Sequence, residues 1–73
     1  MPLKSLPFRE IRRRLLAAGW REAGQTGSHV KFAKRVGNGL RTTIVPKHRE
    51  VALGTLRGIQ RQAGISPEDF ERL

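Results

Sequence analysis

The chain has 73 residues, which is enough for one small domain but not for a nucleotide-binding unit with a separate substrate domain. It holds 15 Lys and Arg residues against six Asp and Glu, so its formal net charge is +9. A charge of this size favours an anionic partner: a nucleic acid, an anionic membrane surface or an acidic protein. The sequence has no cysteine, which excludes disulfide bonds, a thiol nucleophile and a cysteine-based zinc site.

The charge is unevenly distributed along the chain. Residues 1–63 contain 14 basic and three acidic side chains, whereas residues 64–73 contain one basic and three acidic side chains. No apolar run approaches the roughly 20 residues of a membrane span. Residues 1–5 lack the apolar stretch of a signal peptide. These features predict a single domain over residues 1–73 that is cytoplasmic and has no membrane partner.

The first predicted element is a helix over residues 8–18. Its apolar residues recur at three- and four-residue steps, as on one helical face. The stripe consists of Phe8, Ile11, Leu15 and Ala18. We expect Ser5 to cap this helix, Pro7 to lie in its first turn and Gly19 to end it. The three arginines at 12–14 fall mostly off the apolar face and are expected to be a solvated basic surface.

Three strands are predicted next, and they are short and separated by turn residues. They cover residues 20–23, 29–34 and 40–45. Gly24 is expected to end the first strand and Pro46 the third. A polar turn at 25–28 and an Asn-Gly pair within 35–39 predict two hairpin connections.

Two further helices complete the predicted order. An apolar stripe predicts a helix over residues 53–63 that Gly64 ends, and Ser66 with Pro67 predicts the start of a short third helix. The order α-β-β-β-α indicates a small α+β fold, a three-stranded antiparallel sheet with helices packed on one face. Its other face is expected to be open to solvent.

His29 is the first candidate functional residue. The alternation in its strand turns Val30 and Phe32 toward the helices, so His29 and Lys31 should face the opposite way. The preceding Gly27-Ser28 pair allows a sharp turn and a close approach by a ligand. From spacing alone, an idle surface histidine is as good an interpretation as a functional one.

An exposed histidine in a basic field suits cleavage of RNA. Imidazole can take up or release a proton near neutral pH, and cations can stabilise the charge that develops on phosphorus. His48, in the predicted loop after the third strand, could be a partner acid or a phosphate contact, although an idle loop histidine is the more common case. The six acidic residues are scattered, which argues against a metal-dependent nuclease.

The chain also resembles the HicA toxins, the small ribonucleases of HicA–HicB toxin–antitoxin pairs. The matching stretches are Ala18-Gly19-Trp20, Gly27-Ser28-His29-Val30-Lys31-Phe32, Thr43-Ile44-Val45-Pro46-Lys47-His48, and residues 53–59 with Gln62-Ala63-Gly64-Ile65-Ser66 and Phe70. The resemblance implies a fold akin to the double-stranded-RNA-binding domain. It further implies cleavage of mRNA without a metal, with inhibition of translation and growth, and a HicB-type antitoxin as protein partner.

The resemblance also assigns roles to individual residues. The catalytic histidine of the family corresponds to His29, and the family's second histidine corresponds to His48. The predicted substrate-binding residues are Gly27, Ser28, Lys31, Lys47 and His48, and no metal or other cofactor is expected. Two alternatives share the same charge and order of elements: a non-catalytic module that binds double-stranded RNA, and a basic structural protein such as a ribosome-associated one.

Overall fold

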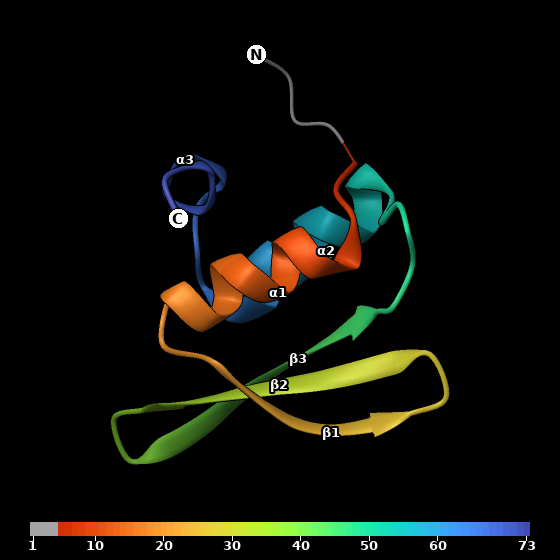
Figure 1. Ribbon diagram of the computed structural model, residues 1–73. Coiled ribbons are helices and arrows are strands. Elements are labelled where there is room, and N and C mark those ends of the chain that lie inside the picture. The colour runs from red at the N-terminus through yellow and green to blue at the C-terminus, as the bar shows by residue number, and fades with distance from the viewer. Residues whose placement is uncertain (1–4) are drawn as a thin grey trace.

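The computed structural model describes residues 5–73, and its elements follow the predicted order (Figure 1). The elements are α1 (Phe8–Ala17), β1 (Arg21–Thr26), β2 (His29–Val36), β3 (Gly39–Pro46), α2 (Leu53–Ala63) and α3 (Pro67–Glu71). The predicted α+β class is therefore confirmed. Residues 1–4, on which part of the argument against a signal peptide rested, lie outside the described residues. Within 5–73, no helix is long and apolar enough to cross a membrane.

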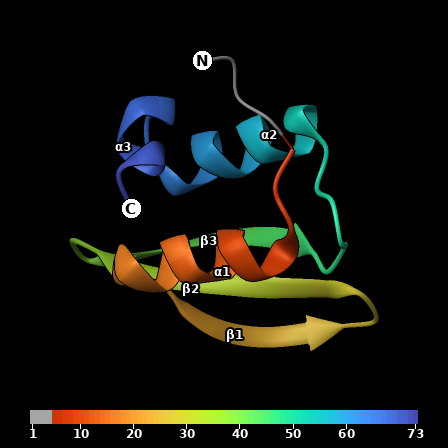
Figure 2. The ribbon, with the colours of Figure 1, turned by 45° about the horizontal axis from the view of Figure 1, so that its top comes forward.

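The three strands form one antiparallel sheet in the order β1-β2-β3. Helices α1 and α2 lie side by side on the same face of this sheet, and α3 follows at the end of α2 (Figure 2). Val30 and Phe32 on β2 are buried toward the helices, whereas His29 and Lys31 are exposed. No helix of the described residues covers the opposite face (Figure 2). The predicted outward direction of His29 is confirmed.

The core lies between the helices and the sheet, and both contribute side chains to it. It comprises Ile11, Leu15, Trp20, Val30, Phe32, Val45, Val51, Leu56, Ile59, Ala63 and Phe70. Phe8 is partly buried and packs against this core, with its ring centroid 6.2 Å from that of Phe32. Trp20, Phe32 and Phe70 are buried and Phe8 packs against them, so all four aromatic side chains serve packing, as predicted.

The start of α1 differs from the prediction. Ser5 does not cap the helix, because it lies two residues before the N-cap position; its hydroxyl instead donates a hydrogen bond to the Glu50 carboxylate at 2.5 Å. Pro7 takes the N-cap position in extended backbone, one residue before the helix rather than in its first turn. The reason is tertiary: Leu6 and Val51 form an antiparallel bridge that holds the preceding segment against the chain before α2.

The hairpins also differ in detail from the prediction. Strand β1 continues past Gly24 to Thr26, with a register irregularity between Glu22 and Gly24, because β2 supplies backbone partners up to the turn. The second turn consists of Gly37 and Asn38, so the glycine of the Asn-Gly pair already belongs to β3. Gly37 has φ +59°, which fits a hairpin turn with glycine at its first central position.

The boundaries of the last two helices agree with the prediction. Gly64 ends α2 in the left-handed region with φ +69°. The Ser66 hydroxyl accepts a hydrogen bond from the Asp69 backbone N–H at 3.1 Å, and Pro67 is the first residue of α3. Phe70 then reaches full burial, which attaches this short helix to the core.

Candidate functional site

The β1–β2 hairpin places His29 immediately after a tight turn. The turn consists of Gly27, with φ +59°, and Ser28. The Gln25 side-chain amide donates a hydrogen bond to the Gly27 carbonyl at 2.9 Å, which stabilises the turn from the side of β1. His29 pairs with Thr26 on one side and with Pro46 on the other, and its side chain is exposed. The backbone of His29 is therefore fixed on both sides by strand pairing, and its imidazole is open to a ligand.

The loop after β3 is tied to this turn by one backbone hydrogen bond. The Lys47 N–H donates to the Ser28 carbonyl at 2.5 Å, directly beyond the pairing of His29 with Pro46. The contact brings Lys47 and His48, both exposed, next to the hairpin turn. Residues about 20 positions apart in the chain thus share one end of the sheet.

The start of α1 lies against the same loop. The Phe8 N–H donates to the His48 carbonyl at 3.0 Å, and the bridge between Leu6 and Val51 adds two backbone hydrogen bonds of 3.3 and 2.7 Å. Three backbone hydrogen bonds therefore fix the first turn of α1 relative to residues 48–51. This arrangement needs little reorganisation when a ligand binds.

A groove of about 550 Å³ lies between these two segments. It is lined by Pro7, Phe8, Arg9, Lys47, His48 and Arg49. Three of these side chains are cations, one is a histidine and none is acidic. In residues 5–73, no carboxylate forms an ion pair with Arg9, Lys47 or Arg49. We call this the basic groove; it suits a phosphate group, which cations attract without any fixed base sequence.

The structure brings together most of the residues that the sequence indicated. Gly27, Ser28 and His29 lie at one hairpin end, and Lys47 and His48 lie beside them. His29 does not line the basic groove itself. Lys31 is two residues further along β2, paired with Ile44, on the same exposed face as His29.

Two cations of the groove were missed by sequence reasoning. Arg49 follows His48 directly, so the run of basic residues in the loop was a usable signal. Arg9 gave no such signal, because its position depends on the hydrogen bond between Phe8 and His48. Only the tertiary structure identifies Arg9 as part of this surface.

The arginines of α1 have a different environment. Arg13 and Arg14 both bind Glu10, at 2.6 and 2.8 Å, and Arg12 binds Glu22 at 2.7 Å. Hydrogen bonds from Arg13, and then from Arg14, lower the pKa of Glu10 to about 2. The expectation of a solvated surface is wrong for Arg14, whose guanidinium lies 5.2 Å from the Phe70 ring centroid and donates to the Phe70 carbonyl at 3.3 Å.

Acidic and histidine side chains do not gather anywhere in the described part of the chain. No group of three or more of them could hold a metal ion there. The chemical groups that surround the hairpin turn are instead imidazole, ammonium and guanidinium. Such a set can transfer protons and stabilise negative charge on phosphate oxygens.

Comparison with known proteins shows the family to which this chain belongs. Among curated proteins, no sequence matches this chain. A family model described as the HicA toxin of bacterial toxin–antitoxin systems matches residues 8–65, which include the hairpin turn, His29 and the loop with Lys47 and His48. Because this match spans most of the chain, from the start of α1 to just beyond the end of α2, the protein belongs to the HicA toxin family.

Proposed function

We propose that this toxin is a metal-independent endoribonuclease that cleaves mRNA and thereby inhibits translation and growth in the cytoplasm. The observation that carries the proposal is the hydrogen bond from Lys47 to Ser28. It brings the loop of Lys47 and His48 to the turn that carries His29, so that two histidines and a lysine with no ion pair in residues 5–73 share one end of the sheet. Membership of a toxin family supports a destructive activity rather than a structural role.

The proposed reaction is a transfer within the RNA strand. His29 takes the proton of a 2′-hydroxyl, whose oxygen attacks the adjacent phosphorus. The bond from phosphorus to the 5′-oxygen breaks, and an acid returns a proton to that oxygen. The products are a 2′,3′-cyclic phosphate and a free 5′-hydroxyl. His48 is the candidate for the acid, since it lies in the loop attached to the turn of His29.

The cations hold the phosphates in this proposal. Lys31 shares the exposed face of β2 with His29, which supports a contact between its ammonium group and the RNA strand. Gly27 and Ser28 form the turn and Lys47 is hydrogen-bonded to it, which supports a close approach of the RNA to the backbone there. The basic groove then receives a neighbouring phosphate. Since all aromatic side chains are in or against the core, we expect backbone contacts to dominate over base stacking.

The test compares the wild-type protein with His29→Ala on a single-stranded RNA in excess chelator. We expect the wild type to cleave and the variant to lose at least 100-fold in rate, as is usual for loss of a general base or acid. Equal cleavage by both proteins would remove His29 from the mechanism. Cleavage that disappears with the chelator would remove the metal-independent reaction.

The second candidate is a module that binds double-stranded RNA without cleaving it. The order of elements favours it as a fold, but it gives no role to an exposed histidine beside a tight turn. It predicts salt-sensitive binding that prefers duplex RNA, with no product at any time. The same cleavage assay therefore separates the two functions.

A further inference from the structure

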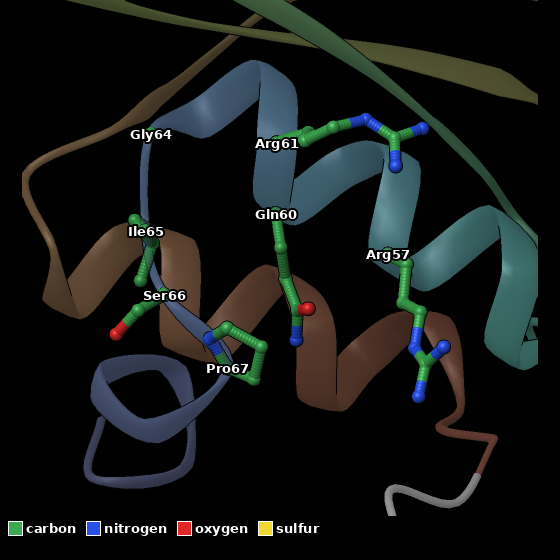
Figure 3. A pocket seen from close by; sticks show the side chains of 7 residues that line it. All are labelled: Arg57, Gln60, Arg61, Gly64, Ile65, Ser66 and Pro67. Atoms are coloured by element: carbon green, nitrogen blue, oxygen red, sulfur yellow. The ribbon is translucent and has the colours of Figure 1, made fainter.

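A second pocket lies at the junction of α2 and α3, away from the hairpin turn. Its volume is about 430 Å³, and it is lined by Arg57, Gln60, Arg61, Gly64, Ile65, Ser66 and Pro67. Figure 3 shows these side chains around the chain segment that leaves α2. The loop with Lys47 and His48 leads to the start of α2, whereas this pocket surrounds the end of the same helix.

Gln60 is the unusual member of this pocket. The residue is only 3% exposed, yet its side-chain Nε2 has no hydrogen-bond partner. It is the one buried side-chain nitrogen or oxygen in the described residues for which this holds. Buried amide groups are nearly always paired, because an unpaired one loses its hydrogen bonds to water without compensation. The nitrogen therefore lacks an acceptor, and because it has almost no accessible surface, a ligand in the pocket can supply one only when the Gln60 side chain turns toward it.

The rest of the pocket indicates what the ligand is. Gln60 and Arg57 point to the same side of α2, with the ring of Pro67 nearby (Figure 3). Ile65 and Pro67 provide apolar walls. A negatively charged oxygen on an aliphatic stem would accept from Gln60, interact with the Arg57 guanidinium and place its methylene groups on these walls.

We propose that this pocket binds a single glutamate or aspartate side chain, flanked by apolar residues, from a segment of a protein partner. Two observations favour a peptide carboxylate over an RNA phosphate. The acceptor must reach a buried nitrogen between apolar walls, whereas cations that bind RNA lie on open surface. The adjoining α3 carries Glu68, Asp69 and Glu71, which repel a polyanionic strand more than a single carboxylate. The +9 chain attracts an acidic protein as a whole.

Arg61 provides a matched control for Arg57. Both arginines border the pocket, but Figure 3 shows the Arg61 side chain extending to the other side of α2, toward the sheet. Its Nη2 lies near Gly58, within 3.9 Å of where a Cβ would stand. Neutralising either arginine changes the net charge equally, and only Arg57 is placed to contact the carboxylate.

The test uses the full chain labelled with ¹⁵N and the tripeptide acetyl-Leu-Glu-Leu-amide as probe. We expect the Gln60 side-chain amide signals to shift on titration. Gln60→Leu should weaken binding at least tenfold, since a hydrogen bond to a charged group is lost. Arg57→Gln should weaken binding about fivefold and Arg61→Gln less than twofold. The tripeptide with Gln in place of Glu should bind at least fivefold more weakly than the Glu peptide.

A parallel titration uses a six-nucleotide 2′-O-methyl RNA, which cannot be cleaved through its 2′-oxygen. The proposal is overturned if this RNA shifts the Gln60 signals at a lower concentration than the Glu peptide does. It is also overturned if the Glu and Gln peptides bind equally, or if no probe moves the Gln60 signals. Circular dichroism checks that Gln60→Leu folds. If it does not, the binding of Arg57→Gln compared with that of Arg61→Gln decides the question, because both arginines are exposed. None of these readouts depends on RNA cleavage.

Discussion

The arginines of α1 and the cations of the basic groove differ in how their charge is compensated. Arg12, Arg13 and Arg14 each bind a carboxylate, and Arg14 also contacts Phe70 of α3. The groove cations Arg9, Lys47 and Arg49 have no such partner in the described residues. Formal charge alone does not distinguish the two groups. Cations paired with a carboxylate hold elements together, whereas cations without such a partner remain available for a polyanion.

Among the contacts that attach α3 to the rest of the domain, we expect the largest loss of stability when Phe70 is replaced. Phe70 is fully buried and is the side chain through which α3 enters the core. Phe70→Ala should cost about 3–5 kcal/mol of the free energy of unfolding. Chemical denaturation with urea measures the loss, with Glu68→Gln on the exposed side of α3 as control. A change below about 1 kcal/mol would show that α3 is not part of the cooperative unit.

The double variant Lys47→Gln/Arg49→Gln tests whether the cations of the basic groove bind RNA. If Lys47 and Arg49 contact phosphates as proposed, the double variant should bind single-stranded RNA about tenfold more weakly, and the slope of log affinity against log salt should fall by about 1.4. The unfolding free energy should stay within about 0.5 kcal/mol. Fluorescence anisotropy with labelled 2′-O-methyl RNA at several salt concentrations gives both binding values.

The matched control for this double variant is Arg12→Gln/Arg13→Gln, which removes the same charge from α1. We expect it to change RNA affinity less than threefold. If both double variants weaken binding equally, net charge alone governs the affinity and the distinction between the two surfaces is lost.

Arg14 should affect stability rather than RNA binding. Its guanidinium is half-buried, binds Glu10, lies over the Phe70 ring and donates to the Phe70 carbonyl. Arg14→Gln should lower the unfolding free energy by about 1–2 kcal/mol. RNA affinity measured on the folded variant should stay within about twofold. A larger loss of affinity with intact stability would place Arg14 on the RNA surface.

The smallest effect is a pH dependence that comes from Glu10. Its pKa is lowered from 4.5 to about 2 by Arg13 and then Arg14, so the folded state binds this proton less readily than the unfolded state. The stabilisation is therefore complete above pH 4.5 and is lost as the pH falls toward 2. Glu10→Gln should cost about 1 kcal/mol at pH 7, and less as the pH falls through this window.

Urea titrations of the wild type and Glu10→Gln at pH 7, 4 and 3 measure this difference. The two proteins should approach each other in stability at the lowest pH. A constant difference across the series would mean that the ion pairs do not stabilise the folded protein.

The two surfaces also differ in how far the sequence predicts them. The alternation over residues 29–34 was enough to place His29 outward, because a strand has a fixed two-residue period. Gly64 and Ser66 were predicted correctly as the end of one helix and the start of the next, because capping depends on the residue itself and its immediate neighbours in the chain. The order of elements followed from such patterns, whereas the roles of Lys47 and His48 came from the resemblance to the HicA toxins.

Contacts between distant segments account for what the sequence did not predict. Ser5 is not the cap because the bridge between Leu6 and Val51 keeps the chain extended there and α1 begins only at Phe8. Arg9 lies in the basic groove because a backbone hydrogen bond joins Phe8 to His48. Arg14 is shielded from solvent because Phe70 lies beside it. Each of these outcomes depends on the packing of helices that no local pattern encodes.

The most direct measurement of the central claim uses two RNA oligonucleotides in excess chelator. One is all-ribose, and the other carries a single 2′-deoxy residue on the 5′ side of the mapped cleavage position. Mass spectrometry identifies the product ends. We predict a 2′,3′-cyclic phosphate from the first substrate and no cleavage at that position in the second. Equal cleavage of both would contradict an attack by the 2′-hydroxyl and the role assigned to His29.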